Sequence, residues 1–498
     1  MSKDKPNILL ITTDQQRHDS LGCYGFKAGY TPNFDQMAKE GVVFDNHYTT
    51  NPVCTPTRSS IHTGKHLPGH SVYKLYDDLP EDEVLFPKKL QETGYKTALV
   101  GKLHVMGRLK EEKQRHPNDG FDEYEWCLEP SISLDSQYNG YSKWLQENHP
   151  EFFKKLSSKG RSLHHFPQEV HMTHWAAERT IHYIDEWGSN QPFFIEMSVF
   201  DPHNPYQDYP KEMLGEIEPD KIPDPLVEEV NMEEKPEAVQ REHENSYLGS
   251  FDDFSEEQLH RMRVGYHASI AFLDQEFGKV KKALERKGIL DETLIIFTSD
   301  HGDMLGDHQL LVKGAFFYDP CTKVPLIIRW PERIEGGKRV TELSQPHDIT
   351  STILSAAGYP DKKKKNEMPE SNDLVQLAED RDNEGHEFAI CIYRNTGINK
   401  NKDYFEPPIY ATMIRGDRYK LNLYHDLTFK DGIEGELFDM KNDQNELNNL
   451  WDDPEYQSVR RRLTERLLDW EVTQELKLGT RGGESLPSSS EKLENKPS

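Results

Sequence analysis

One stretch of the sequence combines a cysteine, a proline and an arginine at a spacing that could do chemistry. Residues 51–65 read NPVCTPTRSSIHTGK and hold Cys54, Pro56 and Arg58. We predict a helix here, capped by Thr55, with Pro56 in its first position because its missing N–H would be unpaired there anyway. The N-terminus of a helix favours anions and makes a thiol reactive. The sequence therefore predicts a reactive Cys54.

Polar side chains also follow four predicted strands. The apolar runs at residues 8–13, 96–100, 193–200 and 294–298 lead, in this order, to Asp14 and Gln15, to Lys102 and His104, to His203, and to Asp300 and His301. In open α/β sheets the ligand crevice lies outside the carboxyl ends of the parallel strands. We therefore expect these side chains to share one site.

The alternation of strands and helices predicts an α/β fold. Ile270, Leu273 and Phe277 fall on one face of a helical pattern that Gly288 can end, directly before the strand at 294–298. Strands separated by such helices form a mainly parallel central sheet with helices on both faces.

The chain is long enough for more than one core. We expect an α/β catalytic domain at residues 1–365, with an acidic surface excursion at 209–256 and a polar loop or boundary at 361–382. Short strands near 410, 419 and 436 and a helix from 457 to about 470 predict a smaller C-terminal α+β subdomain at 366–475 with an antiparallel sheet. Residues 476–498 have the composition of a disordered tail.

The overall charge and the cysteines limit the class of protein. A formal net charge of −27 over 498 residues argues against nucleic acid or an anionic membrane as the main partner. The N-terminal apolar run is too short for a signal peptide, and no stretch approaches a membrane span. The 5 cysteines are scattered and odd in number, which argues against a disulfide framework or a structural zinc site and predicts a cytoplasmic protein.

The motifs together resemble those of the sulfatase family. Cys54-Thr-Pro-Thr-Arg58 followed by Thr63-Gly64 resembles the sulfatase signature, and the other clusters match sulfatase motifs in the same order. These are Asp14-Gln15, Gly101-Lys102-x-His104, Pro202-His203-x-Pro205, Ser299-Asp300-His301-Gly302, Lys313, and Glu436-Leu-Phe-Asp with the residues that follow to Leu450. The resemblance covers about residues 5–470 and implies an alkaline-phosphatase-like fold. The Asp-Gln opening is more similar to choline sulfatases and phosphonate monoester hydrolases than to lysosomal arylsulfatases.

The resemblance implies a modified residue and a metal. Cys54 would be oxidised to formylglycine by a formylglycine-generating or anaerobic sulfatase-maturing enzyme. Asp14, Gln15, Asp300 and His301, with residue 54, would bind one divalent cation. Calcium is the first expectation, and a histidine at 301 also makes magnesium or manganese reasonable. A hard-metal cage suits an oxygen nucleophile better than a thiolate, so Cys54 is expected to be a precursor of the nucleophile.

The same resemblance implies roles for the remaining residues. The hydrated formylglycine would attack sulfur, and His104 would be the base that later restores the aldehyde. Arg58 and Lys102 would steady the diol and the metal shell. His203 and Lys313 would bind sulfate oxygens and protonate the leaving group.

The predicted activity is hydrolysis of a sulfate ester, with a mild preference for a sulfated carbohydrate. One alternative is a phosphonate monoester or phosphodiester hydrolase with the same machinery, and another is a catalytically silent homologue that binds metal or sulfated glycan. Substrate specificity should come from residues 105–170, the excursion and the C-terminal subdomain. The aromatic residues that could stack on a sugar or aryl group are Tyr73, Tyr76, Trp126 and Tyr206. The sequence does not indicate the oligomeric state.

Overall fold

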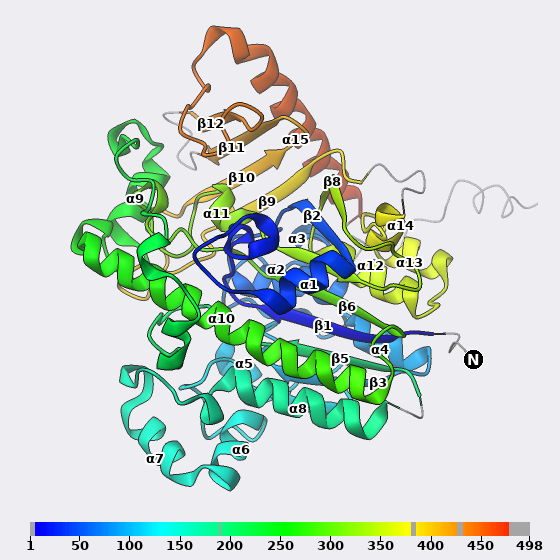
Figure 1. The fold of residues 1–498 in the computed structure, drawn as a ribbon. Coiled ribbons are helices and arrows are strands. Elements are labelled where there is room, and N and C mark those ends of the chain that lie inside the picture. Colours follow the sequence, from blue (N-terminus) through cyan, green and yellow to red (C-terminus); the bar gives the residue numbers. More distant parts are fainter. Residues whose placement is uncertain (1–4, 189–190, 380–384, 426–431, 478–498) are drawn as a thin grey trace, which may run out of the picture.

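The computed structural model describes residues 5–188, 191–379, 385–425 and 432–477. At its centre is an eight-stranded sheet in the order β4-β3-β5-β1-β6-β7-β2-β8 (Figure 1). The strands are β1 Asn7–Thr13, β2 Val42–His47, β3 Lys96–Gly101, β4 Glu123–Trp126, β5 Phe193–Ser198, β6 Thr293–Ser299, β7 Leu326–Arg329 and β8 Lys338–Ser344. Only β7 is antiparallel to its neighbours, β6 and β2. The predicted mainly parallel sheet is confirmed.

The central strand β1 packs against helices on both of its faces. Leu9 and Ile11 belong to one core cluster, while Ile8 and Leu10 belong to another, and all four side chains are fully buried. Successive strand residues point to opposite faces, so a continuous apolar run is needed when both faces are covered. The first cluster includes residues of α1 (Pro32–Glu40), α8 (Met172–Trp187) and α10 (Glu256–Lys287). The second includes residues of α2 (Cys54–Thr63), α4 (Phe86–Glu92) and α12 (His347–Ala356).

The helix α10 has clear start and stop signals. Ser255 and Gln258 form a capping box, in which each side chain accepts a hydrogen bond from the other residue's backbone N–H. Gly288 ends the helix in the left-handed conformation, with φ of +68°, as the sequence predicts. Figure 1 shows α10 and α8 side by side over the same part of the sheet.

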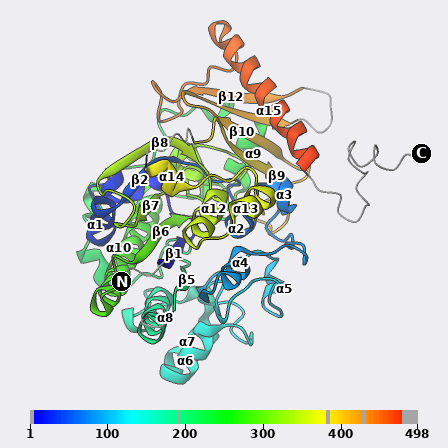
Figure 2. The ribbon, with the colours of Figure 1, turned by 90° about the vertical axis from the view of Figure 1, so that its right-hand side faces the viewer.

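A second, antiparallel sheet follows in the C-terminal part of the chain, with the order β12-β11-β10-β9. Its strands are β9 Ala389–Arg394, β10 Tyr410–Arg415, β11 Tyr419–His425 and β12 Glu434–Asp439. Leu463 and Leu467 of α15 (Gln457–Lys477) pack with Leu421 and Leu437 of this sheet (Figure 2). The expected α+β arrangement is present, whereas the domain limits at 365 and 475 stay predictions. Most of the expected tail, residues 478–498, lies outside the described residues.

Two segments are more regular than expected. The polar stretch at 361–382 contains α13 (Asp361–Glu367) and α14 (Leu374–Ala378). Asp373 caps α14 by accepting hydrogen bonds from the N–H groups of Val375 and Gln376, and Leu374 and Leu377 are buried in the core. The loop prediction is wrong because α14 is too short to be indicated by its own sequence pattern. Its stability comes from packing against the rest of the protein. The acidic excursion likewise contains α9 (Glu237–Asn245) between short 3-10 turns.

The remaining short helices lie in the connections between strands. They are α3 Leu67–His70, α5 Arg108–Glu111, α6 Gly140–Asn148, α7 Pro150–Lys159 and α11 Asp319–Thr322. Among the described residues, no helix is both long enough and apolar enough to cross a bilayer.

An ion pair between a partly exposed histidine and a buried aspartate joins the two sheet regions. His386, just before β9, places Nε2 2.8 and 2.9 Å from the two carboxylate oxygens of Asp348 in α12. Asp348 also accepts the backbone N–H groups of Gln345 and Asn372, each at 2.8 Å. Burial lowers the pKa of His386, but the carboxylate of Asp348 outweighs burial and raises it overall. The pair is therefore strongest when His386 is protonated.

We predict that the contribution of this pair to stability depends on pH. Because the folded-state pKa of His386 is raised, its stabilisation is complete below about pH 6.5 and is lost as pH rises through the folded-state value. His386→Gln keeps a neutral donor, so it should cost about 2 kcal/mol at pH 5.5 and clearly less at pH 9. The measurement is the difference in thermal unfolding midpoint between wild type and variant at both pH values. An equal difference at both would contradict the prediction.

Candidate active site

The site lies where four neighbouring strands of the large sheet end. β3, β5, β1 and β6 are adjacent and parallel, so their carboxyl ends meet at one edge. The end of β3 needs a glycine: Gly101 has φ of +111°, and a Cβ there would lie 1.9 Å from the carbonyl oxygen of Ser198. This close approach brings Lys102, whose N–H bonds the same oxygen at 3.0 Å, beside the end of β5.

The helix α2 starts at Cys54 and is buried throughout, since all of its 10 residues are buried. Thr55 does not cap it: Val53 occupies the cap position without a side-chain hydrogen bond. The Thr55 hydroxyl instead donates to the carbonyl oxygen of Leu75 at 2.8 Å and lies 3.1 Å from His104 Nε2. The prediction of the cap is wrong because tertiary partners claim this hydroxyl. Cys54 itself lies at the N-terminus, as expected.

Arg58 connects the strand ends to α2. Its Nε donates to Asp300 Oδ2 at 2.7 Å, and its Nη1 donates to the carbonyl oxygen of Lys102 at 3.0 Å and to Ser198 Oγ at 2.9 Å. The side chain is 1% exposed. The planar guanidinium suits this role because its donors point in fixed directions. Arg58 therefore holds the ends of β3, β5 and β6 around one centre.

Four predicted ligands lie close enough to share a cation. The ligand atoms of Asp14, Cys54, Asp300 and His301 all lie within 4.8 Å of one another. Asp14 Oδ1 and Gln15 Oε1 are buried without a hydrogen-bond partner, an expensive arrangement that a bound cation would relieve. Gln15 has φ of +69°, a conformation rare outside glycine and frequent at functional sites. The oxygen-rich donor set fits a hard divalent cation.

The sequence did not indicate how Gln15 is oriented. Its Nε2 donates to Asp303 Oδ2 at 2.6 Å, which leaves Oε1 as the free acceptor. Tyr206 donates its hydroxyl hydrogen to the same Asp303 oxygen at 2.7 Å. Asp303 is thus a second support for the candidate metal site. From the sequence, Asp303, Asp307 and His308 lie close to the metal motif and are predicted to be supporting or cleft residues, but nothing there separates Asp303 from the other two.

Lys313 reaches the same centre from a distant loop. Its Nζ lies 3.4 Å from Cys54 Sγ, 2.9 Å from His203 Nε2 and 3.2 Å from His301 Nε2. Lys102 Nζ is hydrogen-bonded to Asp14 Oδ2. In an enzyme matured at residue 54, the Cys54 sulfur atom would stand in for an oxygen of the modified side chain. All the predicted site residues are therefore brought together.

The charges at the centre favour anions. Burial would raise the pKa of Asp14, but Lys102 and other nearby cations hold it well below its usual value. Burial and Asp14 would raise the pKa of the Cys54 thiol, yet Lys102, Lys313 and a hydrogen bond with His104 lower it well below the ordinary value. An anionic group next to residue 54 is thus stabilised, although the chain as a whole is acidic.

The two histidines beside Cys54 are neutral at pH 7. Burial and the charge of Lys102 lower the pKa of His104 to about 4. Burial and the charge of Lys313 lower the pKa of His203 well below its usual value. A neutral imidazole can accept a proton, so His104 is suited to act as a base.

A cavity of about 400 Å³ opens above Cys54, with Lys102, His104, His203 and Lys313 in its wall. All three regions expected to set specificity contribute to it. They supply Arg108, Leu128, Glu129, Ile132 and Arg161 from 105–170, Tyr247 from the excursion, and Gly397, Ile398 and Lys402 from the C-terminal part. Its volume lies in the range of small-molecule binding sites.

Only one of the four aromatic candidates lines this cavity. Tyr76, which is 49% exposed, lines the cavity. Trp126 is fully buried and bonds Glu111, Tyr206 is buried against Asp303, and Tyr73 lines a different pocket. These three rings therefore cannot stack on a substrate in this cavity. Trp126 and Tyr206 are buried within the protein, and Tyr73 lies at another pocket.

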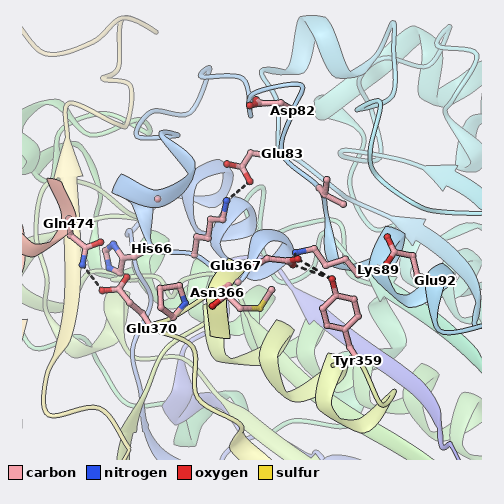
Figure 3. Close-up of a pocket in the computed structure, with 16 residues that line it drawn as sticks. His66, Asp82, Glu83, Lys89, Glu92, Tyr359, Asn366, Glu367, Glu370 and Gln474 are labelled. Carbon is pink, nitrogen blue, oxygen red and sulfur yellow. Dashed lines mark hydrogen bonds and ion pairs between the residues drawn. The ribbon is translucent and has the colours of Figure 1, made fainter. Parts of the chain in front are cut away.

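A larger cavity, about 860 Å³, lies beyond the other end of α2 (Figure 3). Both of its lysines are paired with glutamates of the same cavity: Lys65 with Glu83 at 2.7 Å, and Lys89 with Glu367. Tyr359 donates to Glu367 at 3.1 Å. This cavity lacks the nucleophile and the cation ligands, so the smaller cavity is the candidate active site.

Comparisons with known proteins indicate the family of the chain. The family model described as Sulfatase matches residues 6–359, and the model described as N-sulphoglucosamine sulphohydrolase, C-terminal, matches residues 306–473. The chain is 29% identical to an arylsulfatase of Clostridium perfringens, with 91% of each chain covered. It is 26% identical to an N-acetylglucosamine-6-O-sulfatase of Bacteroides thetaiotaomicron, covering 93% of this chain and 86% of that one. The phosphonate monoester hydrolase of Agrobacterium radiobacter shares the fold, with a TM-score of 0.75, 23% identity, and 94% and 96% of the two chains covered.

The unpartnered oxygens predict measurable cation binding. Calcium at about 100 times its Kd should stabilise the folded protein by about 2.7 kcal/mol, so removing it with a chelator should lower the thermal unfolding midpoint. Asp14→Asn should abolish this calcium response, whereas Asp224→Asn, an exposed position, should retain it. Calcium, magnesium and manganese are compared by adding each back after chelation. Unfolding that none of the three cations changes would argue against a cation site here.

Proposed function

Since the chain belongs to the sulfatase family and is a sulfuric ester hydrolase, we propose that it cleaves its ester with a formylglycine formed from Cys54 and one divalent cation. The observation that supports this most strongly is the geometry around Cys54. The side chain lies at a helix N-terminus, 3.4 Å from Lys313 Nζ and within 4.8 Å of three candidate cation ligands. Neither a silent homologue nor a metal-binding protein needs this combination.

The bound groups would supply the nucleophile and a Lewis acid. Hydrated formylglycine offers an oxygen nucleophile, and the cation neutralises charge on the sulfate oxygens. Asp14, Gln15, Asp300 and His301 would hold the cation, with calcium as first choice. Because α2 is buried throughout, the maturing enzyme must reach Cys54 before the chain has folded.

The other residues of the site have separate proposed roles. Lys313 and His203, whose side-chain nitrogens are 2.9 Å apart, would bind sulfate oxygens, and the Lys313 ammonium would deliver a proton to the leaving oxygen. Neutral His104 would accept the proton of the second hydroxyl of residue 54 when sulfate departs. Arg58 and Lys102 would keep the carboxylates of Asp300 and Asp14 in place.

The proposed substrate is the sulfate ester of a small ring, with a carbohydrate as the preferred class. Leu128 and Ile132 offer apolar contact to a ring face, while Arg161 and Lys402 offer donors to its substituents. The Bacteroides thetaiotaomicron relative is named for a sulfated amino sugar, which supports this class. The scattered cysteines support a cytoplasmic location.

The nucleophile can be tested directly. We predict that the peptide containing Cys54 from active protein has the mass of formylglycine, and that Cys54→Ala lowers kcat by at least about 10⁴-fold with an unchanged fold. Peptide mass spectrometry and initial rates on an aryl sulfate give the two measurements, and circular dichroism gives the control. Fully active protein with an intact Cys54 thiol would refute the proposed nucleophile.

A panel of esters tests which class of ester the protein hydrolyses. Turnover should be highest for sulfate monoesters, and within these a sulfated mono- or disaccharide should have a higher kcat/KM than choline sulfate. A phosphonate monoester, such as 4-nitrophenyl phenylphosphonate, and a phosphodiester test the alternative activity on the same protein preparation. A kcat/KM for the phosphonate monoester or the diester above that for every sulfate ester would favour the alternative hydrolase.

A further inference from the structure

Lys313 lies on a loop between Gln309 and α11, and its position depends on how that loop is held. The loop is fixed before Lys313 by the backbone hydrogen bond from Met304 N–H to the carbonyl oxygen of Val312 at 2.8 Å. The Lys313 side chain is surrounded by His203, His301 and Cys54, none of which is a hydrogen-bond partner of its backbone. The backbone after Lys313 has an anchor in a side chain of another segment.

Glu242 provides that anchor. This residue belongs to α9 in the acidic excursion and is 2% exposed. Its Oε1 accepts the backbone N–H of Ala315 at 2.6 Å, and the hydroxyl of Tyr393 in β9 lies 3.5 Å from the same oxygen. The carboxyl group therefore ties α9 and the C-terminal sheet to the loop that carries Lys313.

Gly314 makes the contact possible. A Cβ at this position would lie 2.5 Å from both Cδ and Oε1 of Glu242, closer than real Cβ atoms approach other atoms. The residue directly after Lys313 thus lacks a side chain where the carboxyl group packs. The carboxyl group of Glu242 packs against the backbone of Gly314, so the position of the loop depends on both residues.

The buried position of residue 242 does not by itself explain why a glutamate is found there. Burial raises the pKa of Glu242 to about 8, so the group is mainly neutral at pH 7 and is kept at a desolvation cost. An apolar side chain of similar volume would avoid that cost but would leave the Ala315 N–H without an acceptor. The carboxyl oxygen is present for the hydrogen bond.

We propose that Glu242 is a positioning residue that fixes Lys313 against residue 54 and the leaving oxygen of the substrate by holding the N–H of Ala315. The inference rests on the proposed role of Lys313 in binding sulfate and protonating the leaving group. It also gives the acidic excursion a task in the reaction, beyond lining the cavity through Tyr247.

The test is a double-mutant cycle in the matured enzyme, with Glu242→Ala, Lys313→Ala and both together. Displacing a reacting group by about 1 Å can cost about 10²-fold, so Glu242→Ala should lower kcat/KM by about that factor in the wild-type background. In the Lys313→Ala background the same change should alter kcat/KM less than about 2-fold. Glu242→Gln, which keeps an oxygen acceptor, should recover most of the activity.

Two further variants separate positioning from stability. Gly314→Ala should reproduce the loss seen in Glu242→Ala, since its new Cβ displaces the carboxyl group, and should add little in the Glu242→Ala background, where that group is gone. Glu229→Ala, an exposed glutamate of the same excursion, should retain wild-type activity. Thermal unfolding of each variant shows whether it is folded at the assay temperature.

The leaving group supplies a readout that a purely structural role would not change. If Lys313 donates the proton, the loss in Glu242→Ala should be larger for phenyl sulfate than for 4-nitrophenyl sulfate, whose leaving oxygen needs less protonation. An equal loss for both esters, or an equal loss in the wild-type and Lys313→Ala backgrounds, would overturn the inference while leaving the role of Lys313 intact. Unchanged activity in Lys313→Ala would remove the proposed role itself and the inference with it.

Discussion

The burial of opposite charges at the carboxyl edge of the large sheet is the constraint on which the rest of the structure depends. Asp14 and Asp300 are fully buried and Arg58 is 1% exposed. Removing one ion from water costs several kcal/mol unless partners compensate it. Here Arg58 compensates Asp300, and Lys102 compensates Asp14. The strand ends, α2 and the loop after β3 must therefore meet with little freedom.

This constraint explains why one oxygen of each of two site residues remains available. Asp14 accepts a hydrogen bond from Lys102 through Oδ2, which leaves Oδ1 without a partner. Gln15 donates a hydrogen bond from Nε2 to Asp303, which leaves Oε1 without a partner. The surrounding groups fix both side chains before any ion arrives. Such preorganisation reduces the free energy that must be spent on ordering when a cation or an anionic ester binds.

The cavity above the site is assembled from segments far apart in the sequence. Arg161 binds Glu129 and donates to the Tyr247 hydroxyl at 2.7 Å, so a wall of the cavity joins the 105–170 region to the excursion. The C-terminal part adds Ile398 and Lys402. The candidate site residues and the cavity wall thus have different sources: strand ends, the start of α2 and the Lys313 loop supply the site residues, and longer connections supply most of the remaining wall.

The sequence by itself predicted β1, β3, β5, β6 and helix α10 and, with the family resemblance, the residues that the structure brings together around Cys54, because apolar runs, helix stop signals and Cys-x-Pro-x-Arg spacing are local patterns. It failed where a group's partner is distant. Thr55 was expected to cap α2, but His104 and Leu75 claim its hydroxyl. Tyr206 was a candidate for stacking and instead supports Asp303. The support of Gln15 by Asp303 and of the Lys313 loop by Glu242 was decided only by the tertiary structure, since hydrogen-bond partners across such separations follow from packing.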